Sequence, residues 1–185
     1  KIDAVAQAHL STLLASRFLA LTAVRLGAVR GMRWDEVEQL DGPEPIWRVP
    51  AARMKLAKAK KADERYDHIV PLSAEAVATL LRMVDHRVDA GGMVFPGRDG
   101  LSPIGEGAIG ALYARAGFAG RHVPHGWRSS FSTILNETLG PDARTDIDRA
   151  LAHSPKDKVE AAYNRAEQLG RRRALFDRWG AMLTT

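Results

Sequence analysis

The amino-acid sequence predicts a mainly helical α+β domain with a small three-stranded antiparallel sheet. Apolar residues recur at spacings of three and four over most of the chain, which is the pattern of helices that bury one face against a core. Three short β-like stretches interrupt this pattern between residues 36 and 72. The chain has 185 residues and is 45 % hydrophobic, so one domain spanning residues 1–185 can bury a core of its own.

Two helices are expected before the sheet. The first covers residues 3–24, and its apolar face is formed by Val5, Leu10, Leu13, Leu14, Phe18 and Leu21. The helical pattern continues over residues 25–34 and stops near Gly31. The first of these helices is amphipathic and therefore faces the core.

The sheet is expected from three neighbouring stretches, namely residues 36–40, 46–50 and 67–72. The sequence Asp41-Gly42-Pro43 lies between the first two stretches and favours a turn. A lysine-rich loop over residues 56–65 connects the second stretch to the third. These three stretches are expected to form a small antiparallel sheet.

Helices dominate the rest of the chain. Ser73 is a suitable N-cap for a helix that runs to Gly91 and Gly92. Another helix is predicted to open at Ser102-Pro103 and to end near Gly117, since serine caps helices and proline suits the first turn. Further helices are expected from Pro124, over residues 141–153, over a short segment capped by Ser154-Pro155 that carries Tyr163, and over residues 167–183.

Composition excludes several classes of function. The chain has no cysteine, which rules out disulfides, iron–sulfur clusters, thiolate zinc sites and a cysteine nucleophile. No zinc-ligand spacing, glycine-rich phosphate loop or paired-carboxylate site is evident, so neither a metal nor a cofactor is expected. No apolar run reaches the roughly 18–20 residues of a membrane helix, and no membrane partner is expected. The net charge is +5, and the start at Lys1 suggests a piece of a longer protein.

Four polar residues stand at the ends of predicted elements in the second half of the chain. His125 and Arg128 are three residues apart near the start of one helix, so both side chains lie on the same face. His153 ends the next helix, and Tyr163 follows ten residues later. Taken singly, each residue type is more often structural: histidine as a half-buried group, arginine as a solvated one and tyrosine as part of a core.

Read together, four segments resemble the tyrosine recombinases, the phage-integrase family, and most closely the prophage-type or genomic-island integrases of bacteria. LTAVRLGAVRGMRWDEVE resembles the first conserved box of that family. IWRVPAARMK followed by HIVPLS resembles its β-hairpin, PHGWRSSFSTIL its second box, and LAHSPKDKVEAAYNRA the segment that ends in its nucleophilic tyrosine. The four segments follow the family order and cover most of residues 17–180.

The resemblance implies a set of catalytic residues and a reaction. The implied roles are two phosphate-clamping arginines, a hairpin lysine, two histidines and a tyrosine nucleophile, carried by Arg25 and Arg128, Lys55, His125 and His153, and Tyr163. A DNA strand would be broken through a 3′-phosphotyrosyl bond that frees a 5′-hydroxyl. A 5′-hydroxyl of the partner strand would then attack that bond, without a metal or a high-energy cofactor.

Physical chemistry supports these assignments. The planar guanidinium fork of arginine matches two phosphate oxygens and stabilises the charge that gathers there. A phenol with a pKa of about 10 needs a base, for which His125 is a candidate, while Lys55 suits the protonation of the leaving 5′-oxygen. His153 is expected to hydrogen-bond the scissile phosphate. The division of acid and base roles among His125, His153 and Lys55 stays open.

Two further features of these segments bear on activity. Lys58, Lys60 and Lys61 follow Lys55 closely, and they either contact the DNA backbone or form a solvated face. Ala28 stands where the family pattern T-G-x-R-x-x-E has its acidic residue, and Ala23 stands where it has glycine. The missing acid is compatible with lower activity, with a substitute partner, or with an engineered or decaying protein.

The resemblance also implies partners. Double-stranded DNA attachment sites are the expected substrate, and a core-binding domain is expected to precede this region. The isolated domain is expected to be monomeric, and the intact protein to act as a homotetramer on DNA in the bacterial cytoplasm, on the nucleoid. The helix from about Glu167 would be donated to a neighbour, and accessory DNA-bending or directionality factors are possible partners. The alternatives are a type IB topoisomerase-like enzyme and a DNA-binding module with reduced or lost catalysis.

Overall fold

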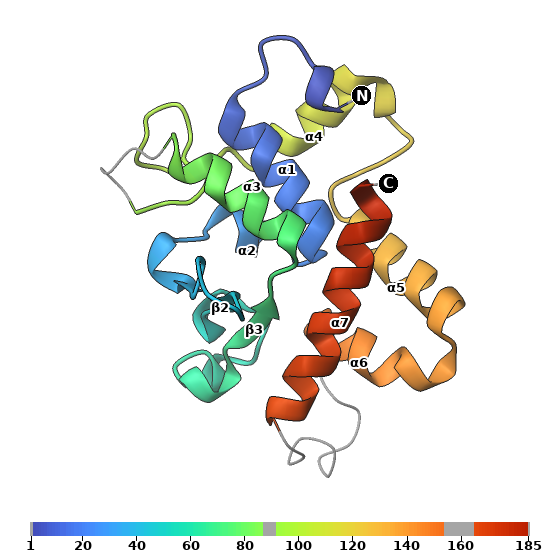
Figure 1. The fold of residues 1–185 in the computed structure, drawn as a ribbon. Coiled ribbons are helices and arrows are strands. Elements are labelled where there is room, and N and C mark those ends of the chain that lie inside the picture. Colours follow the sequence, from blue (N-terminus) through green and yellow to red (C-terminus); the bar gives the residue numbers. More distant parts are fainter. Residues whose placement is uncertain (1, 87–91, 154–164, 185) are drawn as a thin grey trace.

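A computed structural model describes residues 2–86, 92–153 and 165–184 of the chain. Within these residues, seven α-helices pack together with one small sheet at their edge (Figure 1). The helices are α1 (Leu10–Thr22), α2 (Leu26–Arg30), α3 (Ala74–Val84), α4 (Ala108–Tyr113), α5 (Gly126–Leu139), α6 (Arg144–Ala150) and α7 (Arg165–Thr184). The strands are β1 (Val37–Glu38), β2 (Ile46–Val49) and β3 (His68–Pro71). The predicted mainly helical fold is confirmed.

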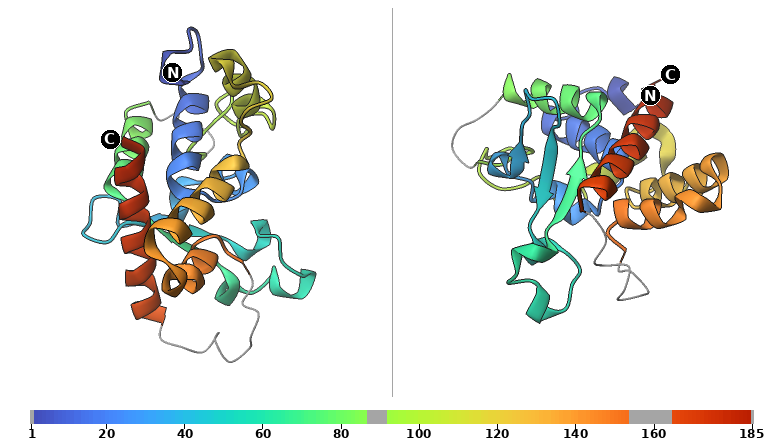
Figure 2. Two further views of the ribbon diagram at one scale, coloured as in Figure 1. Left: turned by 90° about the vertical axis from the view of Figure 1, so that its right-hand side faces the viewer. Right: turned by 60° about the horizontal axis from the view of Figure 1, so that its bottom comes forward.

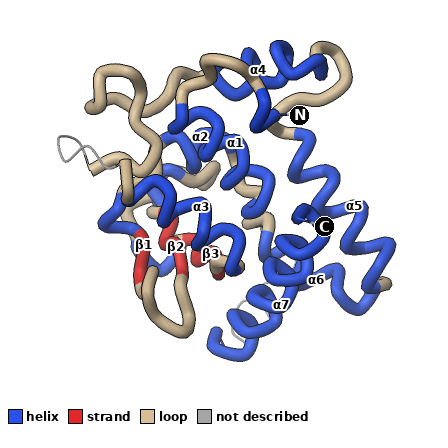
Figure 3. Tube along the Cα trace, turned by 45° about the horizontal axis from the view of Figure 1, so that its top comes forward, coloured by secondary structure: helices blue, strands red, loops and turns tan. Residues whose placement is uncertain are grey.

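The predicted antiparallel sheet is also confirmed. Its strand order is β1-β2-β3, and Trp47 of β2 lies opposite Val37 of β1 and Val70 of β3. Figure 3 shows the three strands side by side, with β3 nearest to α7. The long connection between β2 and β3 contains three short 3₁₀ turns, at Ala51–Arg53, Lys58–Lys60 and Glu64–Tyr66. The lysine-rich loop predicted from the sequence therefore carries local structure.

The core is built between α1, the sheet and the C-terminal helix. The ring of Phe18 on α1 lies 5.6 Å from the rings of both Trp47 and Phe95. On the other side of α1, Trp179 of α7 packs edge-on against Phe131 of α5 and donates a hydrogen bond from Nε1 to the carbonyl of Ala20, at 2.7 Å. Hydrophobic burial at these aromatic contacts joins the N-terminal helix to the last one.

Helix α7 packs along its own chain, between α5 and α6 on one side and α1, α3 and β3 on the other (Figures 1 and 2). Leu175, Phe176 and Trp179 of this helix are buried, as the apolar spacing predicted. The donation of this helix to a neighbour stays a prediction, because in the single chain it completes the core of the domain. No helix in the described part of the chain has both the length and the hydropathy needed to cross a membrane.

Two predicted helix starts and one predicted helix end were wrong. The helix expected from Ser102-Pro103 begins at Ala108, because Pro103 instead pairs with Pro96 in an isolated β-bridge that buries Ile104. The first helix begins at Leu10 rather than near residue 3, after a short 3₁₀ turn.

The helix capped by Ser73 ends at Val84, well before the glycines that were expected to stop it. The cap itself is confirmed, since Ser73 Oγ accepts a hydrogen bond from the backbone N–H of Ala76. Gly91 and the segment that begins at Ser154-Pro155 and carries Tyr163 lie outside the described residues.

Candidate active site

Arg25 and Arg128, which are 103 residues apart in the sequence, line one small cavity. Arg25 is the N-cap residue of α2, and Arg128 lies in the first turn of α5. Arg53 and His68, from the hairpin formed by β2, β3 and their connection, also line this cavity. Its free space is about that of one water molecule, so it has room for a single oxygen atom rather than a whole phosphate group.

Arg128 is held rigidly by backbone carbonyls. It is only 6 % exposed, and it donates from Nη1 to Ala23 O at 2.8 Å and from Nη2 to Leu151 O at 2.7 Å. Burial, and then the nearby charge of Arg25, lower the pKa of Arg128 to about 10. The group therefore still carries its charge at neutral pH, although that charge is costly to keep in the cavity.

Ala23 offers its carbonyl to Arg128 because of an unusual backbone conformation. It caps the C-terminus of α1 with φ +49°, in the left-handed region that favours glycine. The glycine of the family pattern at this position thus has a conformational reason, and alanine here adopts the same turn at some cost in strain.

His153 contacts Arg128 from the segment that follows α6. Its Nε2 lies 3.4 Å from Arg128 Nη2, and its Nδ1 lies 2.9 Å from Asp148 Oδ1. Because Arg128 can only donate, Nε2 acts as the acceptor and Nδ1–H donates to the carboxylate. Asp148 therefore sets the orientation and tautomer of an exposed histidine beside the buried arginine.

His68 is a buried member of the same cavity. Its Nε2 lies 3.2 Å from the carbonyl of Ala150, to which it donates. Burial lowers its pKa to about 3, and the charges of Arg172, Arg128 and Arg25 add to this effect. His68 is therefore neutral at physiological pH and acts as a structural donor between β3 and the end of α6.

The other predicted catalytic residues lie on the surface around the cavity. Lys55 is exposed and directly follows Met54, whose side chain lines the cavity. His125 is exposed at the N-cap of α5, and its carbonyl accepts the backbone N–H of Arg128 at 3.1 Å. The structure thus brings together Arg25, Arg128 and His153, but it does not place Lys55 or His125 in the lining. Tyr163 lies outside the described residues.

Lys58, Lys60 and Lys61 are exposed on and beside the middle 3₁₀ turn of the hairpin loop. Lys60 Nζ lies 5.0 Å from the ring centroid of Tyr66, which holds this lysine over an aromatic face. None of the three lines the cavity. Their positions suit contact with an extended polyanion more than entry into the site.

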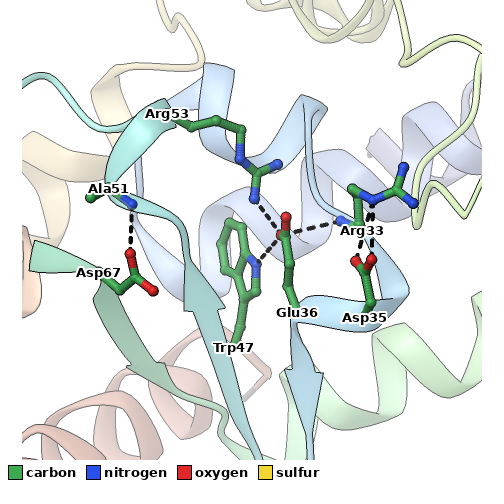
Figure 4. Close-up of polar contacts among 7 residues, drawn as sticks. All are labelled: Arg33, Asp35, Glu36, Trp47, Ala51, Arg53 and Asp67. Atoms are coloured by element: carbon green, nitrogen blue, oxygen red, sulfur yellow. Dashed lines mark hydrogen bonds and ion pairs between the residues drawn. The ribbon is translucent and has the colours of Figure 1, made fainter. Parts of the chain in front are cut away.

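Ala28, which stands where the family pattern has an acidic residue, is part of the cavity wall. Ala28 is buried there, one turn along α2 from Arg25. A carboxylate does reach this region from another element: Glu36, just before β1, forms an ion pair with Arg53 (Figure 4). Sequence reasoning missed Arg53 as a site residue, and its place two residues before Lys55 is the signal that could have indicated it.

Comparison with known proteins shows the family to which the chain is related. The model of the Phage integrase family matches residues 2–169. Prophage integrase IntA of Escherichia coli (strain K12) is 37 % identical over 165 residues, which make up 88 % of this chain and 36 % of that protein. Prophage integrase IntZ of the same strain is 37 % identical over 164 residues, covering 88 % of this chain and 37 % of that protein.

The integrase of Shigella phage Sf6 is 31 % identical over 173 residues, covering 93 % of this chain and 42 % of that protein. The chain therefore spans about two fifths of the length of these relatives. No solved structure gives a significant match. The family model covers nearly the whole chain, so the chain belongs to the phage integrase family.

Proposed function

We propose that this chain is the catalytic domain of a site-specific DNA recombinase that integrates and excises a mobile element by strand cleavage and rejoining. The observation that carries this function is the shared cavity of Arg25 and Arg128. Within the described residues, neither guanidinium has a carboxylate in ion-pair distance. Two guanidinium charges that no described carboxylate pairs with, beside space for one oxygen, suit a non-bridging oxygen of a DNA phosphate.

The proposed reaction requires no external energy source. The phenol oxygen of Tyr163 attacks the scissile phosphorus and forms a phosphotyrosyl bond, while the bond from phosphorus to the 5′-oxygen breaks. The phenol proton passes to His125, and the Lys55 ammonium gives a proton to the departing 5′-oxygen. The products are a 3′-phosphotyrosine and a free 5′-hydroxyl.

Rejoining reverses these bond changes with a new strand. The 5′-hydroxyl of the partner strand attacks the phosphotyrosine, and the tyrosine leaves and regains a proton. Arg25 and Arg128 stabilise the charge on the non-bridging oxygens in both directions, and His153, held by Asp148, orients the guanidinium of Arg128 from the side. Because every bond broken is matched by one formed, no high-energy cofactor is needed, and the two arginines supply the charge stabilisation that a metal would otherwise give.

The wider assembly also belongs to the proposal. Double-stranded attachment sites are the substrate, and a homotetramer on DNA brings four such domains together. In that tetramer, α7 would exchange its contacts with α1 and α3 of its own chain for the same contacts on a neighbour. A preceding core-binding domain and accessory directionality or DNA-bending factors complete the assembly, in the cytoplasm of a bacterium.

Covalent capture on a randomised substrate tests the function and itself selects the DNA that is cleaved. The chain is incubated with a pool of nicked duplexes, labelled at the 5′ end of the cleavable strand and randomised around the nick. The short 5′-hydroxyl fragment diffuses away, so the covalent complex accumulates and is seen by denaturing electrophoresis. Sequencing of the captured DNA then gives a cleavable duplex.

Tyr163→Phe is the decisive variant, because it removes the nucleophilic oxygen and nothing else. We expect no covalent complex from this variant, together with nearly unchanged DNA binding. Tyr66→Phe, on the exposed hairpin loop, is the matched control and should form the complex normally. Binding without any covalent complex from the unaltered chain would favour the alternative of a DNA-binding module, which the missing acid at Ala28 already suggests.

A further inference from the structure

The guanidinium of Arg53 lies between Glu36 and the end of α2. One side of it forms an ion pair with Glu36, whose side chain is only 10 % exposed (Figure 4). The same carboxylate oxygen, Oε2, accepts hydrogen bonds from Trp47 Nε1 at 3.0 Å and from the backbone N–H of Arg33 at 3.2 Å. Glu36 is thus fixed by the sheet and by its own turn before it binds Arg53.

The other side of Arg53 lies against α2. Its Nη1 is buried and has no hydrogen-bond partner in the described part of the chain. A Cβ atom built on Gly31 would lie 2.8 Å from this nitrogen, which is closer than side chains approach. Gly31 therefore leaves the space that the guanidinium occupies, directly after α2, the helix whose N-cap is Arg25.

The segment that leads to Lys55 is tied down by its neighbours at both ends. The backbone N–H of Ala51 donates to Asp67 Oδ1 at 2.8 Å, which joins this segment to the returning strand (Figure 4). Arg53 binds Glu36, and Met54 is buried in the cavity wall. Lys55 is exposed immediately after these contacts. The path of the chain at Lys55 is therefore set by Arg53 and its partner.

We propose that Arg53 is a positioning residue that holds Lys55 at the rim of the Arg25–Arg128 cavity, with Glu36 as its anchor, an inference that rests on the proposed function. Arg53 does not serve as a third phosphate clamp, because its charge is neutralised by Glu36 and its Nη1 is closed off by α2. Glu36 supplies from the 3₁₀ turn before β1 the carboxylate that the family pattern places on α2, where this chain has Ala28.

A change of leaving group separates this role from a general effect on the fold. The captured duplex is prepared in two forms, one with the ordinary 5′-oxygen at the scissile phosphate and one with sulfur in its place. A thiol has a pKa of about 8.5, so the sulfur leaves as a thiolate without a proton from Lys55. Loss of Lys55 or of its position should slow cleavage of the oxygen form alone.

We expect Arg53→Gln and Glu36→Gln to slow formation of the covalent complex on the oxygen form by about 10²-fold, and to leave the sulfur form near the rate of the unaltered chain. Lys55→Ala should behave in the same way. Gly31→Ala, which leaves both partners in place but crowds Nη1, should give a smaller loss of the same kind. Arg53→Lys keeps a positive charge beside Glu36 and should recover part of the rate.

Arg65→Gln is the matched control on the same hairpin. Arg65 also binds a carboxylate, that of Asp63, but it is 78 % exposed, and its replacement should leave both rates unchanged. Equal slowing of both substrates by Arg53→Gln, or no slowing of either, would overturn the positioning role while leaving the recombinase function intact. If the unaltered chain forms no covalent complex with either substrate, both the function and the role of Arg53 are wrong.

Discussion

His68 and Arg128 bind two consecutive carbonyl groups at the end of α6. The imidazole of His68 donates to Ala150 O and the guanidinium of Arg128 donates to Leu151 O. One donor comes from the hairpin strand β3 and the other from α5, and the chain reaches His153 two residues later. The hairpin, the arginine helix and the second histidine are therefore joined through one helix terminus, whose carbonyls would otherwise lack partners.

This junction predicts a pH-dependent stability. The pKa of His68 is about 3 in the folded chain, whereas an unfolded histidine titrates near about 6.5. Between these values the unfolded state binds the proton more tightly, so the free energy of unfolding falls as the pH drops from about 6.5 towards 3. The expected slope is about 1.4 kcal/mol per pH unit in this window.

Urea unfolding at pH 7, 6 and 5 measures this slope in the unaltered chain and in His68→Gln. The variant should lose this part of the pH dependence, since glutamine does not titrate. His86→Gln, at an exposed position, is the matched control and should follow the unaltered chain. The same slope in His68→Gln as in the unaltered chain would assign the pH dependence to other groups.

Arg128 should be irreplaceable even by another cation. Lysine keeps the positive charge but cannot donate to Ala23 O and Leu151 O and still face the cavity, because it lacks the planar fork. We expect Arg128→Lys to slow formation of the covalent complex by about 10²-fold or more. Arg144→Lys, at an exposed position, controls for the substitution itself. A rate near that of the unaltered chain would contradict the clamp.

Trp179 should account for much of the stability that α7 gives to the domain. Its ring is buried against Phe131, and its Nε1 binds Ala20 O. Truncation to alanine should lower the free energy of unfolding by about 3–5 kcal/mol, as for other large core aromatics. Met182→Ala, on the exposed side of the same helix, should cost less than about 1 kcal/mol. Similar values for both variants in urea unfolding would show that α7 is not part of the core in solution.

The three exposed lysines of the hairpin loop should make the affinity for DNA depend more steeply on salt concentration. Each lysine that neutralises a phosphate releases counterions, so the slope of log K against log salt should become shallower by roughly 0.9 for each one removed. The test compares replacement of Lys58, Lys60 and Lys61 by glutamine with Arg82→Gln, an exposed charge on α3. An unchanged slope in the triple variant would make these lysines a solvated face.

Local signals in the sequence predicted those parts of the fold that depend on neighbouring residues. Ser73 caps its helix, Gly31 follows the end of α2, and the turn at Asp41-Gly42-Pro43 separates paired strands. The helix expected from Ser102-Pro103 failed for a different reason. Ser102-Pro103 matches a helix-capping pattern, but Pro103 forms a β-bridge with Pro96 instead of starting a helix. In this arrangement Ile104 is buried in the core.

The site also contains residues that the sequence predicted and residues that only the structure reveals. Arg25 and Arg128 were found because they stand in recognisable segments, and the structure adds that both line one cavity. The roles inferred for His68 and Arg53 come from contacts with Ala150 and Glu36, which are 82 and 17 residues away. Such contacts leave no trace in the spacing of a single sequence, since they exist only after the chain has folded.

Helix α7 also contacts the edge of β3 that does not pair with β2. The backbone N–H of Leu72 binds Pro45 O, so in the alternating antiparallel pattern Ile69 and Pro71 direct their backbone groups away from β2. Pro71 has no N–H to offer there, and the carbonyl of Ile69 accepts Arg172 Nη1 at 2.8 Å. While α7 is docked, the Ile69 carbonyl is occupied and Pro71 has no N–H, so this edge of the sheet offers a foreign strand few groups for pairing.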